Sequence, residues 1–158
     1  MGGKQYKRPE SVLVVICNER GEVLLLERRR PLGFWQSVTG ALRRGETPQA
    51  AARRELWEET GFDHAIPLLD LREQRRFPII PPWSRRYAPG ARTNLEHWFL
   101  ACVPGRRMPL LSRAEHRRWR WLPAARAAEQ VFSWTNREAI ETYCGLCRQV
   151  CGCSGDRT

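Results

Sequence analysis

Apolar and polar residues follow patterns along this chain that predict an alternation of strands and helices. A β-branched run over 11–17 ends at a turn that contains Gly21, and a second apolar run over 22–28 follows it, which predicts a β-hairpin. Further strands are expected over 34–39, 67–77, 95–103 and 119–122, and a closing helix over 135–150. With the helix described next, the order β-β-β-α-β-β-β-α predicts an α/β protein with a mixed sheet between helices.

The segment from Thr47 to Gly61 carries the start and stop signals of a helix. Thr47 is a suitable N-cap, and Pro48 fits the first helical position, where a backbone N–H is not needed. Gly61 can adopt the left-handed conformation that ends a helix. Ala52 and Leu56 share the side opposite the glutamates described next, and we expect this side to pack on the sheet.

Three glutamates, Glu55, Glu58 and Glu59, lie on one face of this expected helix. Like charges at this spacing destabilise a helix, so a cation or an arginine must compensate them. Carboxylate oxygens suit Mg²⁺ or Mn²⁺ better than zinc, and Mg²⁺ is commonly held by carboxylates together with substrate phosphates. We expect Arg54 to neutralise Glu58 while the other two bind the metal. The alternative is an ordinary solvated acidic helix end.

The residues around these glutamates extend the pattern well beyond an acidic helix. They resemble the signature Gly-x5-Glu-x7-Arg-Glu-U-x-Glu-Glu-x-Gly-U of Nudix hydrolases, where U is apolar. The matching positions are Gly40, Glu46, Arg54, Glu55, Leu56, Glu58, Glu59, Gly61 and Phe62. The resemblance implies the Nudix α/β/α sandwich, and the lack of a Cβ at Gly40 would let its carbonyl approach the metal closely.

Segments outside the signature resemble the bacterial dihydroneopterin triphosphate diphosphatases of folate biosynthesis. These segments are 6–16, 34–40, 86–90 and 133–140, so the resemblance covers about residues 6–141. It implies Mg²⁺-dependent release of pyrophosphate from 7,8-dihydroneopterin triphosphate, through attack of an activated water on phosphorus. Two alternatives remain: a Nudix enzyme for normal or oxidised nucleoside triphosphates or for RNA 5′ ends, and a catalytically silent nucleotide-binding Nudix module.

The same resemblance implies roles for individual residues. Glu55, Glu59 and Glu115 are expected metal ligands. The general base is not given by the resemblance, and Glu58 is expected to serve because it is nearest these ligands and paired with Arg54. The expected substrate-binding residues are Lys7, Arg28, Thr39, Phe77, Pro78, Ile79, Ile80 and Ser133. Lys7 and Arg28 would hold phosphate oxygens, Thr39 phosphate or water, and the apolar residues the flat pterin ring. The alternatives are surface charge for the basic residues and Glu115, and core packing for the apolar ones.

Composition constrains the compartment and the partners. The 158 residues suit one domain, and the longest apolar run, over 12–17, is far too short to cross a bilayer, so a cytoplasmic protein is expected. The formal charge of +10 suits a small-molecule polyphosphate substrate. Nucleic-acid binding is less favoured, because the arginines are scattered over every segment. The sequence does not indicate an oligomeric state.

A cysteine-rich tail over 144–158 follows the expected Nudix domain over 1–143. Cys144, Cys147, Cys151 and Cys153 lie within ten residues, and the first three would share one face of a continuous helix. The Cys-x2-Cys spacing is typical of zinc sites, but such sites usually combine two separated pairs. The alternative is small buried thiols or a reduced tail, and no disulfide is expected in a reducing cytosol.

Overall fold

The computed structural model describes residues 5–151, together with the side chains of 5–150. Within this range one sheet of seven strands forms the centre of the molecule. The strands are β1 (Glu10–Cys17), β2 (Glu22–Arg28), β3 (Trp35–Gln36), β4 (Val38–Ala41), β5 (Leu68–Pro78), β6 (Thr93–Cys102) and β7 (His116–Pro123). The helices are α1 (Pro48–Thr60), the 3-10 helix η1 (Trp83–Arg86), α2 (Ala124–Gln130), α3 (Trp134–Tyr143) and α4 (Leu146–Cys151).

The sheet is mixed, as the element order predicts. β1 runs parallel to β6, and every other strand pair of the described chain is antiparallel. The expected hairpin is correct but short, because β1 and β2 pair only at Ile16 with Leu24 and Cys17 with Val23 before they diverge. β4 then pairs with β1, and β7 pairs with β2.

The single strand expected over 34–39 divides into β3 and β4 at Ser37. β3 pairs with β2 and β4 with β1, so the chain changes partner at this residue. The buried Ser37 N–H donates to Asn136 Oδ1 at 2.9 Å, and Asn136 Nδ2 donates to Ser37 Oγ at 2.8 Å. A side chain of α3 therefore satisfies the backbone where the ladder is interrupted.

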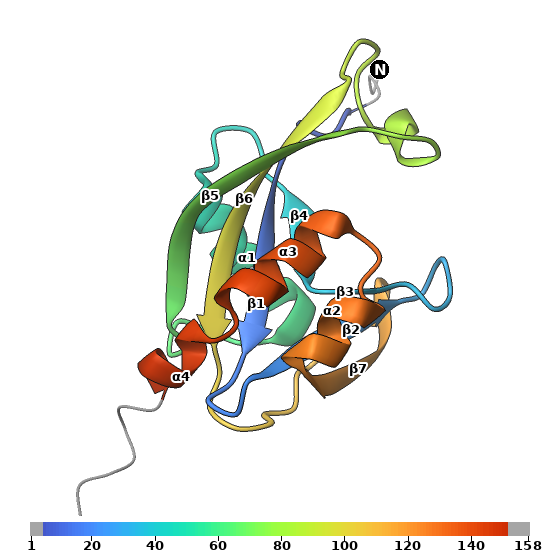
Figure 1. Cartoon of the computed structure of the whole chain (residues 1–158). Helices are drawn as coiled ribbons and strands as arrows, with labels where there is room; N and C mark the ends of the chain where they lie inside the picture. Colours follow the sequence, from blue (N-terminus) through green and yellow to red (C-terminus); the bar gives the residue numbers. More distant parts are fainter. Residues whose placement is uncertain (1–4, 152–158) are drawn as a thin grey trace, which may run out of the picture.

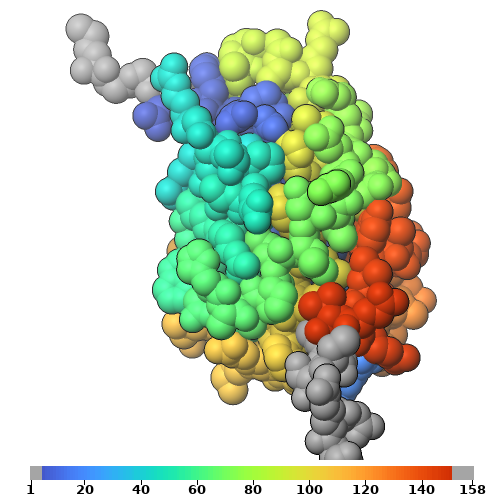
Figure 2. All heavy atoms as spheres, turned by 90° about the vertical axis from the view of Figure 1, so that its left-hand side faces the viewer, coloured from blue at the N-terminus to red at the C-terminus, as the bar shows by residue number. Residues whose placement is uncertain are grey.

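Helices cover both faces of the sheet and produce the sandwich. In Figure 1, α1 lies behind the sheet, and α2 and α3 lie in front of it. The edge view in Figure 2 shows β5 between α1 on one side and the C-terminal helices on the other. Alternate residues of β1 enter separate cores: Val12, Val14 and Ile16 face α1, whereas Leu13, Val15 and Cys17 face the other helices. Among the residues described, no helix is long and apolar enough to span a membrane.

The C-terminal part differs from the pattern expected from sequence. The helix α2 was missed, because its seven residues follow β7 directly and are too few to show a clear period. The closing helix expected over 135–150 is two helices, which a turn at Cys144 and Gly145 separates. Glycine is a poor helix former, which favours the break at this point.

The cysteines of the tail do not form the one-faced cluster that was expected. Cys147 is fully buried and forms a disulfide with Cys17 of β1, and its sulfur lies 2.8 Å from that of Cys102. The expectation of no disulfide is therefore wrong, because α4 packs its cysteine into the core instead of onto the surface. Cys144 lies outside both helices, while Cys153 and the side chain of Cys151 lie outside the described part of the chain.

Candidate active site

The helix α1 places its glutamates in different environments. Its caps are as predicted: Thr47 Oγ1 accepts from Ala50 N at 3.2 Å, and Gly61 has a φ of 72°. The helix packs on the sheet through Ala52 and Leu56, which are fully buried. The Glu59 side chain, on the buried side of the helix, is 2% exposed, whereas the side chain of Glu58 is 43% exposed.

Glu59 is the centre of a group that we call the carboxylate cluster: Glu55, Glu59, Glu115 and His116. Ligand atoms of Glu59, Glu115 and His116 lie within 4.8 Å of one another. The His116 Nε2 is 3.6 Å from Glu59 Oε1, and Glu55 lies near enough for its charge to raise the pKa of Glu59. The start of β7 thus brings a carboxylate and an imidazole to α1. The predicted ligands Glu55, Glu59 and Glu115 are gathered in one place.

The cluster holds more negative charge than its surroundings compensate. Burial raises the pKa of Glu59 well above its usual value, and the charges of Glu55 and Glu115 raise it further. Burial also raises the pKa of Glu55, against the lowering effect of Arg54. Burial and the charge of Arg28 lower the pKa of His116 to about 4, so this imidazole is neutral at neutral pH.

Two buried atoms and one glycine indicate that this cluster fits a cation. Glu59 Oε2 and His116 Nδ1 have no hydrogen-bond partner within the described chain, although buried polar atoms rarely lack one. A Cβ on Gly40 would overlap the carboxylate of Glu55, so glycine is required for Glu55 to lie where it does. Carboxylate oxygens predominate among the donors, which suits a divalent cation of the Mg²⁺ or Mn²⁺ type.

Arg54 connects α1 to the loop before it, and its main partner differs from the expected one. Its Nε and Nη2 donate to the two oxygens of Glu46 at 2.9 and 2.8 Å, and its Nη1 donates to Glu55 at 2.7 Å. Glu58 is a more distant partner at 3.3 Å. The paired arginine lowers the pKa of Glu46 to about 2. Arg54 therefore positions Glu55 and the loop more than it neutralises Glu58.

A group of basic residues lies next to the carboxylate cluster. Lys7 pairs with Tyr87 in a parallel β-bridge, and the backbone N–H of Lys7 donates to the backbone carbonyl of Arg86 at 2.7 Å. Partial desolvation and the charges of Arg86 and Arg28 lower the pKa of Lys7. The charges of Glu55 and Glu115 act on Lys7 in the opposite direction. Lys7, Arg28 and Arg86 thus form a cationic group beside the carboxylates.

The remaining residues expected to bind substrate have structural contacts of their own. Thr39 Oγ1 donates to the carbonyl of Val12 at 2.9 Å, and Ser133 Oγ caps α3 by accepting from Asn136 N at 3.0 Å. Phe77 and Pro78 end β5, where they pair with Asn94 and Thr93. Ile79 and Ile80 lead into η1, and Ile80 is exposed.

Two members of the site, His116 and Arg86, were not predicted from sequence. His116 directly follows Glu115, and an adjacent acid and histidine at the start of a strand would have been a usable signal. Arg86 follows Arg85 in the proline-rich segment over 78–89, and nothing in that segment distinguishes it from the many other arginines of the chain. Its role depends on the pairing of residues 7 and 87, which no local pattern indicates.

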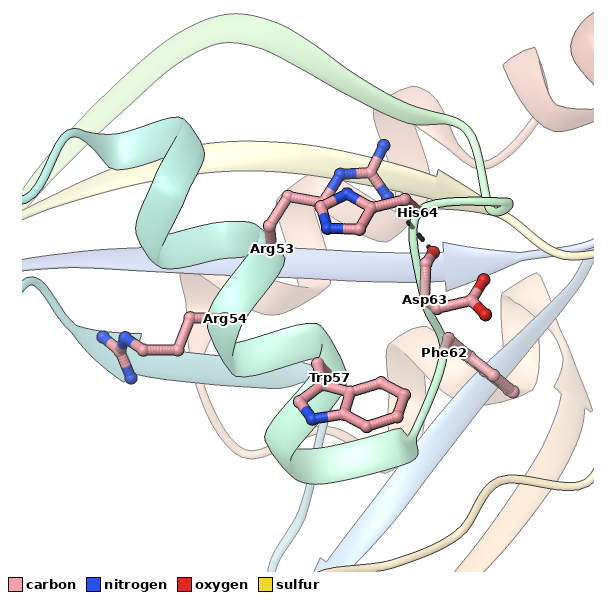
Figure 3. Close-up of a pocket in the computed structure, with 6 residues that line it drawn as sticks. All are labelled: Arg53, Arg54, Trp57, Phe62, Asp63 and His64. Atoms are coloured by element: carbon pink, nitrogen blue, oxygen red, sulfur yellow. Dashed lines mark hydrogen bonds between the residues drawn. The ribbon is translucent and has the colours of Figure 1, made fainter.

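The pocket drawn in Figure 3 lies apart from this site, on the outer side of α1. It is lined by Arg53, Arg54, Trp57, Phe62, Asp63 and His64. The guanidinium of Arg54 points away from Trp57 and Phe62 (Figure 3). Arg53 Nη1 donates a hydrogen bond to the backbone carbonyl of Asp63 at 3.4 Å. The carboxylates of the cluster do not line this pocket.

Known proteins are similar to this chain, in sequence and in fold, along most of its length. The NUDIX domain family model matches residues 7–143. Dihydroneopterin triphosphate diphosphatase of Escherichia coli K12 is 42% identical over 147 residues, which cover 90% of this chain and 97% of that protein. The Haemophilus influenzae protein of the same name is 43% identical, over 88% of this chain and 89% of its own.

The structural comparison agrees. The structure of the E. coli dihydroneopterin triphosphate pyrophosphohydrolase superposes with a TM-score of 0.83 at 42% identity, over 89% of this chain and 97% of that one. The expected mixed-sheet Nudix fold is confirmed. Together with the complete signature from Gly40 to Phe62, these matches show that the chain belongs to the Nudix hydrolase family.

Proposed function

We propose that this protein hydrolyses 7,8-dihydroneopterin triphosphate to the monophosphate and pyrophosphate, in folate biosynthesis. The observation that carries this proposal is the 42% identity to the E. coli diphosphatase over nearly the full length of both chains. The carboxylate cluster and its cationic neighbours supply the groups that such a reaction requires. The substrate is a small-molecule triphosphate with a flat heterocyclic ring.

Mg²⁺ is the proposed cofactor, and Mn²⁺ can replace it. Glu55, Glu59 and Glu115 would hold the ion, and the neutral imidazole of His116 borders the same place. Such an ion supplies charge neutralisation for the phosphates and lowers the pKa of an attacking water. In return it would relieve the repulsion that raises the pKa of Glu59.

We propose separate roles for the other residues of the site: phosphate binding, orientation of Glu55 and proton transfer. Lys7, Arg28 and Arg86 would bind phosphate oxygens and stabilise charge that develops on them. Arg54 holds Glu55 in position through the ion pairs described above. Glu58 is the proposed general base. Unlike Glu46, Glu55 and Glu59, it is substantially exposed, which leaves it able to accept a proton from water.

A comparison of substrates tests the proposal. Dihydroneopterin triphosphate, dGTP, 8-oxo-dGTP and 5′-triphosphate RNA would be assayed in parallel with Mg²⁺. We expect the highest kcat/KM for dihydroneopterin triphosphate. A higher value for another substrate would reassign the enzyme within the Nudix family, and no hydrolysis of any of them would favour a silent binding module.

The role of Glu58 has its own test. Replacement by glutamine keeps the shape of the side chain and removes the proton acceptor. We expect Glu58→Gln to lower kcat by at least about 100-fold, the usual contribution of a general base, with an unchanged melting temperature. Near-normal kcat would remove Glu58 from this role.

A further inference from the structure

Three aromatic rings from separate segments meet at the surface, and we call them the aromatic cluster: Phe34, Trp83 and Phe132. The ring centroids of Phe34 and Phe132 are 4.7 Å apart, and Trp83 lies 6.3 and 6.4 Å from these two. Trp35 and Val131, the chain neighbours of Phe34 and Phe132, form a parallel β-bridge, which places the rings of Phe34 and Phe132 side by side. These distances are those of interacting aromatic side chains.

The cluster remains accessible to solvent. Phe132 is 65% exposed, and Phe34 and Trp83 are half-buried. None of the three rings belongs to either buried core of the described chain. A contact that served only to join loops would gain most by burying its rings, because the gain is proportional to the apolar area removed from water. The exposed face of Phe132 is therefore open to a flat apolar partner.

The aromatic cluster is continuous with the cationic group. The guanidinium of Arg28 lies 5.6 Å from the centroid of the Phe34 ring, so Arg28 borders both. The short helix η1 makes a second connection, because it carries Trp83 at one end and Arg86 at the other. Since Arg86 contacts Lys7, the order in space is carboxylates, then cations, then aromatic rings.

We infer that the aromatic cluster binds the heterocyclic ring of the substrate while the cationic group holds its phosphates, an inference that rests on the proposed function. A ligand with a metal-bound phosphate chain at one end and a flat ring at the other matches this order of groups. Stacking on aromatic side chains accepts any flat heterocycle. The cluster would therefore supply affinity for the ring, with Phe132 as its most accessible face.

One reaction product, dihydroneopterin monophosphate, carries the ring, and the other, pyrophosphate, does not. Because the enzyme does not hydrolyse either product, their binding can be measured at equilibrium. Equilibrium dissociation constants would be measured for dihydroneopterin monophosphate and for pyrophosphate, with Mg²⁺ and the full chain. In Phe132→Ala we expect the affinity for the ring-bearing product to fall about tenfold, the loss of one stacking contact. Pyrophosphate should bind within twofold of the wild-type value.

Matched variants make the result specific. Phe132→Tyr keeps the ring and should retain affinity. Trp57→Ala removes an aromatic side chain of similar exposure, 58%, from the outer side of α1 and should change neither constant. The inference is overturned if Phe132→Ala weakens the binding of pyrophosphate as much as that of the ring-bearing product.

A parallel titration with GMP separates this inference from the proposed function. If another triphosphate is the preferred substrate, the proposed function fails, yet a dependence of GMP binding on Phe132 would still place a ring on the cluster. If neither ring-bearing ligand depends on Phe132, the inference fails, whatever substrate the enzyme prefers.

Discussion

Two clusters of metal-ligand residues with buried members lie on opposite faces of the sheet, and they differ in how the burial of these members is compensated. The carboxylate cluster lies beside α1 and retains unpaired polar atoms and a raised pKa at Glu59. The cysteine cluster of Cys17, Cys102 and Cys147 is packed among apolar side chains of the other core. In each cluster the potential ligand atoms of three residues lie within 4.8 Å of one another, close enough to hold one metal ion.

The difference shows that spacing alone does not indicate a binding function. Sulfur is soft and weakly polar, so cysteines can be buried at little cost and can join to each other. Ionised carboxylates cannot be buried without a compensating charge. The first cluster therefore favours a bound cation, as proposed above. In the second, Cys17 and Cys147 are joined by a disulfide, and the sulfur of Cys102 lies 2.8 Å from that of Cys147. We expect the first to govern activity and the second to govern stability.

The largest effect is expected at Glu59. Glu59→Gln should lower kcat/KM by about 1000-fold, because it removes a proposed ligand of the proposed cation that would neutralise the phosphates. In a chelator the same variant should be at least as stable as wild type, because a buried charge has been removed. Rates and melting temperatures in EDTA would check both. A marked loss of stability in EDTA would show that the carboxylate is already compensated without a cation.

Gly40 should be the next most sensitive position. Gly40→Ala inserts a methyl group into the place of the Glu55 carboxylate and should lower kcat/KM by about 10- to 100-fold, the range seen when a metal ligand is poorly oriented. Gly145→Ala is the control, since a Cβ there meets no atom within 4 Å. Steady-state rates at several Mg²⁺ concentrations would measure the effect. Equal rates for the two variants would contradict the close approach.

On the cysteine side the expected effect is on stability. Cys147→Ser breaks the link to Cys17, which closes a loop of 130 residues, and should lower the free energy of unfolding by about 2–4 kcal/mol. Denaturant titration would measure this, with Cys144→Ser as the control outside the cross-link. We expect kcat/KM at 25 °C to stay within twofold. A strong loss of activity in the folded variant would break the separation between the two clusters.

The smallest effect concerns Glu46, whose pKa is lowered to about 2 by Arg54. A carboxylate with a lowered pKa stabilises the fold above its unfolded value of 4.5, and this advantage is lost as the pH falls towards 2. Glu46→Gln should therefore cost about 2 kcal/mol at pH 7, the worth of a hydrogen bond to a charged group. The difference from wild type should shrink between pH 5 and about 2. A difference that does not vary with pH would mean that Glu46 contributes through its shape alone.

The same contrast explains which features could be predicted from the sequence. The caps of α1 were predicted correctly because Thr47, Pro48 and Gly61 act on their own neighbours along the chain. The separate acidic side was wrong, because Glu59 is buried on the same side as Ala52 and Leu56. The family resemblance correctly indicated the fold. The roles of the individual site residues stay predictions, although the structure brings Glu59 and Glu115 together with His116 and places Glu55 near Glu59.

Features that depend on distant pairing could not be predicted. The division of the third strand depends on Asn136, and the position of Arg86 depends on the pairing of residues 7 and 87. Cys147 meets Cys17 because α4 packs on the sheet, whereas the local spacing suggested a zinc motif. The aromatic cluster likewise requires three distant segments to meet: the residue before β3, the helix η1, and the connection between α2 and α3.

The bond between Ser37 and Asn136 has a consequence for biosynthesis. The backbone just before Thr39 and Gly40 is held by a residue that leaves the ribosome about 100 residues later. Glu115 also arrives late. A nascent chain that has already made α1 therefore lacks both Glu115 and the bond that holds Ser37 until its last third is synthesised. A prematurely ended chain would lack a complete carboxylate cluster even though its signature motif is complete.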